Sequence, residues 1–126
     1  MINGLHHISM KTTNDTQYAK AKSFYTEVLD LSVIMECDSC LLLDTGNGVV
    51  EIFKNGDCDL GQGVIRHFAL ATDDVDACAE KVEKAGYEVF IKPKNVCVGG
   101  DEAFPARIAF CKGPLGEEIE FFCQGW

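Results

Sequence analysis

The chain contains two copies of one order of segments, and this duplication limits its possible folds more than any other feature. In each copy a strand-like segment precedes a helix-like segment and three further strand-like segments, which predicts two β-α-β-β-β modules at about residues 1–58 and 63–126. Strands are expected at about residues 5–12, 32–36, 39–44 and 48–54, and then at 64–72, 88–92, 103–112 and 117–124. Asn14-Asp15 and Asp73-Asp74 are typical helix caps, and the second copy has room for a longer loop over residues 93–105.

The two copies carry the same pair of side chains at matching places. His7 lies in the first strand of one copy and Glu51 in its last strand, while His67 and Glu120 occupy the same places in the other copy. Imidazole nitrogens and carboxylate oxygens are ligands for borderline divalent ions. The repeated pattern therefore predicts a metal site formed by these four residues.

Strand alternation selects one of two adjacent histidines as the ligand. Because successive side chains point to opposite faces, Ile8 and Met10 share one face, which suits packing on a helix. His6 falls on that same apolar face. His7 falls on the opposite face together with Lys11, where side chains could line a cavity. We therefore predict that His7, and not His6, binds the metal.

Composition excludes several classes of partner. The net charge of −9 disfavours binding to nucleic acid or to an anionic membrane, because both are negatively charged. No apolar run is long enough to span a bilayer, and the first residues lack the basic-then-apolar order of a signal peptide. We therefore expect a cytoplasmic protein that has neither nucleic acid nor a membrane as a partner.

The seven cysteines are odd in number and scattered, which favours reduced thiols over a disulfide framework. Cys37 and Cys40 have the spacing of zinc and redox motifs, but no second such pair accompanies them. The simplest interpretation is a reduced pair in a hairpin. Asp101-Glu102, in the long loop of the second copy, could belong to a lid over a site.

Several segments together resemble the vicinal oxygen chelate superfamily, which is the glyoxalase/bleomycin-resistance/dioxygenase group. The matching segments are His7-Ile8, Phe24-Tyr25, Val28-Leu29, Val50-Glu51-Ile52-Phe53, His67-Phe68-Ala69-Leu70, Asp73-Asp74-Val75, Gly113-Pro114-Leu115-Gly116 and Ile119-Glu120-Phe121. The resemblance implies an α+β fold, in which two β-α-β-β-β modules form a curled mixed sheet around a metal-bearing cavity. It also implies a homodimer, because in many members the modules of two chains pair.

Within this superfamily the set His7, Glu51, His67 and Glu120 is most similar to that of glyoxalase I. The resemblance implies one divalent ion (Ni, Co, Zn or Mn) and a substrate made from a 2-oxoaldehyde and a thiol. The implied reaction converts their hemithioacetal into a 2-hydroxyacyl thioester through an enediolate. Glu120 is the expected general base, with Glu51 as its counterpart across the metal.

The substrate pocket is expected to include five further residues. Phe53 and Phe122 share strand faces with the two glutamates, so they would form apolar walls. Asn55 falls where glyoxalase I carries a glutathione-contacting asparagine, and Lys11 stands where the family uses an arginine for the glutathione carboxylate. Lys11 and Arg107 are also candidate contacts for an anionic substrate.

Two other function classes remain open on the sequence. One is a metal-free protein that sequesters a small molecule or drug, as bleomycin-resistance proteins do. The other is an epimerase or a dioxygenase of the same superfamily. Both share the predicted fold, so fold alone does not distinguish them from a lyase.

Overall fold

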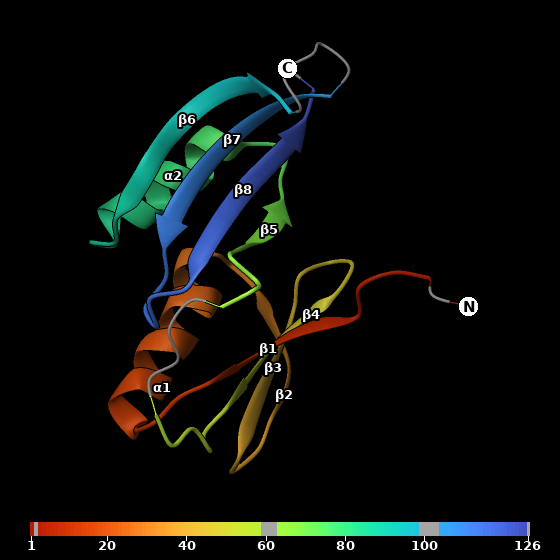
Figure 1. Cartoon of the computed structure of the whole chain (residues 1–126). Coiled ribbons are helices and arrows are strands. Elements are labelled where there is room, and N and C mark those ends of the chain that lie inside the picture. Colours follow the sequence, from red (N-terminus) through yellow and green to blue (C-terminus); the bar gives the residue numbers. More distant parts are fainter. Residues whose placement is uncertain (2, 59–62, 99–103, 126) are drawn as a thin grey trace. The chain divides into compact units, whose positions relative to one another are not determined.

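The computed structural model describes residues 1, 3–58, 63–98 and 104–125, and the chain divides into two compact units, Met1–Gly61 and Gln62–Trp126. Each unit contains one four-stranded mixed sheet and a helical segment between its first and second strands (Figure 1). The expected lid residues Asp101-Glu102 lie outside the described residues.

The sheet of the first unit has the strand order β1-β4-β3-β2. The central strand β4 (Val49–Phe53) runs parallel to β1 (His7–Lys11) and antiparallel to β3 (Cys40–Asp44). The edge strand β2 (Ser32–Glu36) pairs antiparallel with β3. The first and last strands of the unit are therefore direct neighbours, which brings residues far apart in the sequence side by side.

The helical segment of the first unit has two parts. The side chain of Asn14 caps α1 (Asp15–Ser23) by accepting a hydrogen bond from the backbone nitrogen of Gln17 at 2.9 Å, as the cap pattern predicted. A π-helical segment, η1 (Phe24–Val28), continues directly from α1. Sequence periodicity gave no sign of this change in helix type.

Alternation along the strands divides the first sheet into a core face and a polar face. Ile8 and Met10 are half-buried, and the Sδ atom of Met10 lies 3.7 Å from the hydroxyl oxygen of Tyr25 in η1. The other core-face residues are fully buried, namely Leu41, Leu43, Val50 and Ile52. His7 and Lys11 are exposed on the opposite face, which confirms the alternation predicted for β1.

The second unit repeats the plan with the strand order β5-β8-β7-β6. The strand β8 (Glu118–Gln124) runs parallel to β5 (Phe68–Ala71) and antiparallel to β7 (Pro105–Lys112), and β6 (Val89–Cys97) forms the edge. The helix α2 (Val75–Lys84) contacts β6, β7 and β8 and covers one face of this sheet (Figure 1).

The strand β6 is longer than predicted. A strand ending at Lys92 and a loop from Pro93 were expected, but β6 continues to Cys97. Pro93 lies where the β6–β7 register shifts, between Ile91 and Lys94, and β6 is an edge strand. A proline is tolerated at such a bulge because its missing N–H removes no regular ladder bond. The first five residues of the predicted loop, 93–97, therefore belong to β6.

The predicted α+β fold class with two β-α-β-β-β modules is confirmed, and each module has its own four-stranded mixed sheet in place of the single curled sheet that was expected. In the part of the chain that the structure describes, no helix is long and apolar enough to cross a membrane.

Candidate functional site

In the first unit, β1 and β4 bring His7 and Glu51 together. The Nε2 atom of His7 lies 3.6 Å from the Oε1 atom of Glu51, and the two side chains are 45% and 19% exposed. The adjacent His6 does not take this place, although its Nδ1 atom lies 2.9 Å from the Nδ1 atom of His7. The structure therefore pairs Glu51 with the histidine that strand alternation selected.

In the second unit, the corresponding residues form a closer and more shielded pair. The Nε2 atom of His67 lies 3.1 Å from the Oε2 atom of Glu120, and the side chains are 24% and 12% exposed. His67 directly precedes β5, and Glu120 lies in β8. The ring of Phe110 meets the ring of His67 edge to face, with centroids 4.9 Å apart.

The two pairs occupy the same register in their parallel ladders. Glu51 pairs with Ser9, the second residue after His7. Glu120 pairs with Ala69, the second residue after His67. Residues directly opposite in a ladder point to the same face. Both imidazole–carboxylate pairs therefore arise from one repeated strand pairing.

The face that carries Glu120 is largely apolar. In the β7–β8 ladder Phe110 is opposite Glu120 and Ile108 is opposite Phe122, so these side chains share one face. Ile108 and Phe110 are buried, and Phe122 packs against them. The predicted wall residue Phe122 is thus part of a larger apolar surface beside the carboxylate. Ile108 and Phe110 were not predicted, although their alternation in 105–112 was a usable signal.

The first unit carries three further residues that the sequence singled out, Lys11, Phe53 and Asn55. Lys11 is exposed and lies opposite Phe53 in the β1–β4 ladder. Asn55 is exposed and follows β4. Its neighbour Gly56 donates a backbone hydrogen bond of 3.0 Å to Thr12, and a Cβ atom at Gly56 would lie 2.9 Å from that carbonyl oxygen. Glycine therefore permits the close approach of the backbone at residue 56 to Thr12.

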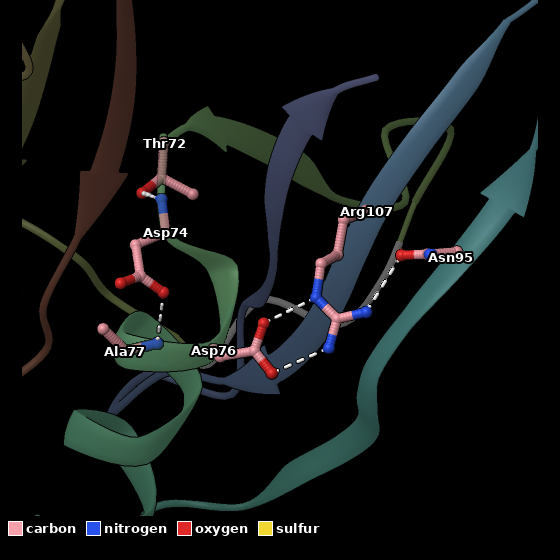
Figure 2. Close-up of polar contacts among 6 residues, drawn as sticks. All are labelled: Thr72, Asp74, Asp76, Ala77, Asn95 and Arg107. Carbon is pink, nitrogen blue, oxygen red and sulfur yellow. Dashed lines mark hydrogen bonds and ion pairs between the residues drawn. The ribbon is translucent and has the colours of Figure 1, made fainter. Parts of the chain in front are cut away.

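Within the second unit, Arg107 does not share a face of the sheet with Glu120. It alternates with Ile108 in β7, and its guanidinium binds Asp76 of α2 through Nε (2.5 Å) and a terminal nitrogen (2.7 Å) (Figure 2). A third hydrogen bond of 2.9 Å reaches the side-chain oxygen of Asn95. The two hydrogen bonds from Arg107 to Asp76 lower the pKa of the Asp76 carboxyl group. Arg107 thus connects β7 to α2 and β6, and Glu120 lies on the other face of the sheet.

The donor atoms fit a divalent ion in type and spacing. Two ligands with bonds of about 2.1 Å to one ion lie about 3 Å apart at a right angle and about 3.4 Å apart at a tetrahedral angle. The two nitrogen–oxygen distances, 3.6 and 3.1 Å, are close to these values. The Nε2 atom of His67 faces Glu120, whereas its Nδ1 atom is buried without a hydrogen-bond partner among the described residues.

Each pair alone supplies only two ligands. Among the described residues, no group of three or more His, Cys, Asp or Glu side chains could hold a metal ion.

Comparison with known proteins agrees with this architecture. The family model described as Glyoxalase/Bleomycin resistance protein/Dioxygenase superfamily matches residues 4–121. Lactoylglutathione lyase GLX1 of Arabidopsis thaliana is 34% identical over 115 residues, which cover 81% of this chain and 38% of the relative. A putative lactoylglutathione lyase of Brassica oleracea var. gemmifera is also 34% identical over 115 residues, which cover 81% of this chain and 39% of that relative. The chain thus spans well under half the length of these relatives.

Solved structures of the same fold include proteins with different described roles. TnmS3, an antibiotic binding protein from Streptomyces sp. CB03234, has a TM-score of 0.73 and 22% identity, with 98% of both chains covered. A lactoylglutathione lyase from Agrobacterium tumefaciens has a TM-score of 0.68 and 13% identity, with 98% of this chain and 95% of that chain covered. At these identities the likeness shows the fold alone.

Two mixed sheets built on one repeated plan define a protein of two β-α-β-β-β modules. With a family model matching residues 4–121, the chain belongs to the glyoxalase/bleomycin resistance protein/dioxygenase superfamily.

Proposed function

We propose that the protein is a metal-dependent lyase of the glyoxalase I kind. It would convert the hemithioacetal of a 2-oxoaldehyde and a thiol into a 2-hydroxyacyl thioester. The observation that carries the proposal is the identical register of the two imidazole–carboxylate pairs, which lie across equivalent parallel ladders. The 34% identity to proteins named lactoylglutathione lyase supports the same reaction class.

Four residues would hold one divalent ion, Ni, Co, Zn or Mn, with His7 and Glu51 from one unit and His67 and Glu120 from another. When bound, the ion supplies a Lewis acid that stabilises negative charge on two adjacent substrate oxygens. The two units would come from one chain or from two chains of a homodimer. In either case each unit contributes half of the ligands.

Glu120 is the proposed general base. Its carboxylate would remove the proton from the carbon that bears sulfur and return a proton to the neighbouring carbon. The reaction is an isomerisation, since the hydroxyl-bearing carbon becomes the thioester carbonyl and the neighbouring carbonyl becomes the hydroxyl. The resemblance to glyoxalase I assigns this role to Glu120, which lies opposite the buried Phe110 in the β7–β8 ladder.

The surrounding side chains would bind the substrate and exclude water. Phe122, Ile108 and Phe110 offer an apolar surface beside Glu120, which suits the carbon skeleton of a 2-oxoaldehyde. Lys11 and Asn55 are exposed in the first unit and would contact the polar part of the thiol. The guanidinium of Arg107 is already bound to Asp76 and Asn95.

The test is turnover after controlled metal loading. The chain is stripped with a chelator and reloaded separately with Ni, Co, Zn or Mn. Thioester formation is then followed with methylglyoxal and a panel of thiols that includes glutathione. We expect at least one metal and thiol combination to restore turnover that the stripped protein lacks. If no ion binds and no combination turns over, the lyase proposal is rejected in favour of a metal-free binding protein.

A further inference from the structure

The turn between β2 and β3 holds two cysteine thiols in contact. The Sγ atoms of Cys37 and Cys40 are 3.1 Å apart, and the backbone nitrogen of Cys37 donates to the carbonyl oxygen of Cys40 at 2.9 Å. A disulfide bond is about 2.05 Å long, so the two sulfurs need to approach by only about 1 Å. The turn is also fixed to the neighbouring strand, because the backbone nitrogen of Lys54 donates to the carbonyl oxygen of Ser39 at 2.9 Å.

The two thiols differ in access. Cys37 is exposed, whereas Cys40 is only 6% exposed. An external reagent therefore reaches Cys37 first, and Cys40 is then the nearest thiol to the modified sulfur. This division into an accessible attacking thiol and a shielded second thiol is what a two-step exchange with an external disulfide requires.

We propose that Cys37 and Cys40 form a thiol–disulfide exchange site whose substrate is the disulfide of a low-molecular-weight thiol. The proposal is independent of the metal-dependent function, because it uses neither histidine nor glutamate. It also changes the interpretation of this pair from a reduced structural feature to a reactive one.

The exchange proceeds in two balanced steps. The thiolate of Cys37 attacks one sulfur of the external disulfide, whose S–S bond breaks, and the leaving thiolate takes a proton from water. Cys40 then loses its proton and attacks the sulfur of Cys37, which releases the second small thiol. Two protein thiols are oxidised to one disulfide, and one external disulfide is reduced to two thiols.

The local hydrogen bonds support this assignment of roles. The hydroxyl of Ser39 lies 3.4 Å from the Sγ atom of Cys37, and this contact together with that from Cys40 lowers the pKa of Cys37 to about 7. The same contact with Cys37, together with burial, raises the pKa of Cys40. Near neutral pH a larger fraction of Cys37 than of Cys40 is therefore thiolate, and thiolate is the reactive form.

The sequence allows a direct mapping experiment. Trypsin cleavage after Lys22 and Lys54 yields a peptide, residues 23–54, that contains Cys37 and Cys40 as its only cysteines. The full chain is reduced, freed of reductant, treated with oxidised glutathione at pH 7, trapped with iodoacetamide and mapped by mass spectrometry. We expect this peptide to lose two hydrogens and to carry no glutathione. Glutathione that stays on Cys37 in the unaltered chain would overturn the proposal.

Variants separate the two steps. Cys40→Ser should accumulate a mixed disulfide with glutathione on Cys37, whereas Cys37→Ser should leave Cys40 largely unmodified. Cys58→Ser is the matched control, because Cys58 is an exposed thiol of the same unit but lies outside the 23–54 peptide. In the unaltered chain, oxidation of Cys58 as fast as that of Cys37 would contradict a specific site at Cys37 and Cys40.

A further variant tests Cys37 without altering a buried position. Ser39 is exposed, and Ser39→Ala removes a hydrogen bond to Cys37. The pH midpoint for alkylation of Cys37, expected near 7, should move upward in this variant. An unchanged midpoint would show that the turn does not activate the thiol.

Discussion

The Nε2 atom of His67 lies 3.1 Å from the Oε2 atom of Glu120, which is closer than the 3.6 Å between the equivalent atoms of His7 and Glu51. Both side chains of the second pair are also less exposed than their counterparts. Electrostatic interactions are weaker where water has access. The two halves of the repeat therefore carry the same chemical groups in different surroundings, and we expect the second pair to be the catalytic one.

Replacement of the two adjacent histidines should have different effects on metal content. His7→Ala should lower the amount of bound ion, because it removes the nitrogen that faces Glu51. His6→Ala is the matched control and should leave metal content nearly unchanged. Elemental analysis after reloading both variants with the same ion measures the difference. Equal losses in both variants would contradict the selection of His7.

Removal of the proposed base should abolish turnover without unfolding the protein. Glu120→Gln should reduce kcat by about 10²–10⁴-fold, the usual contribution of general acid–base catalysis. Glu118→Gln is a suitable control, because Glu118 lies in the same strand and is 16% exposed but pairs with Lys112. Circular dichroism would verify that both variants are folded. Equal activity in the two variants would remove Glu120 from the mechanism.

The pair of Asp76 and Arg107 should make stability depend on pH. The hydrogen bonds from Arg107 lower the pKa of Asp76 in the folded state. The stabilisation is therefore fully present above the unfolded-state pKa, about 3.9, and is lost as the pH falls through the lower folded-state pKa. Denaturant unfolding at a series of pH values should show Asp76→Asn to be less stable at pH 7, with the difference vanishing in acid.

A conservative change at the partner tests the geometry of the same pair. Arg107→Lys keeps the charge but loses the two-pronged contact with Asp76. The pKa of Asp76, followed by NMR titration, should rise toward its usual range. A pKa that stays low would show that charge alone accounts for the shift.

Loss of the second helix cap should destabilise the protein measurably. The side chain of Asp74 accepts a hydrogen bond of 2.9 Å from the backbone nitrogen of Ala77, and its own nitrogen donates to Thr72 at 3.0 Å (Figure 2). Asp74→Ala should lower the free energy of unfolding by about 1 kcal/mol. Asp73→Ala removes an adjacent acid that is not the cap and should cost less. Thermal unfolding of both variants gives the comparison.

Most of the fold could be predicted because local sequence signals mark the strands and the helix of each module. Asn14 and Asp74 marked the helix starts. The predicted bounds of β2 agree with the observed ones, Ser32–Glu36. The end of β6 was not predictable, because Pro93 signals a break unless the partner strand is known to shift register there. The π-helical character of η1 depends on packing and not on periodicity.

The two histidine and glutamate pairs could also be predicted, since the same two residue types recur at matching places in the repeated module. The environment of Arg107 could not, because its bond to Asp76 depends on how α2 lies over the sheet. The contact between Cys37 and Cys40 required the conformation of a specific turn. Side-chain partners across different elements were thus the main information that the sequence lacked.

In the β1–β4 register His6 precedes His7, so a second imidazole lies one residue away from the position beside Glu51. If β1 slipped by one residue along β4, His6 would take the place that His7 holds beside Glu51, whereas the same slip in the second module would bring in Arg66. Burial of Ile8 and Met10 opposes such a slip, because every side chain of the strand would change faces. Deletion of His7 should therefore leave a histidine beside Glu51, whereas deletion of His67 should place Arg66 beside Glu120.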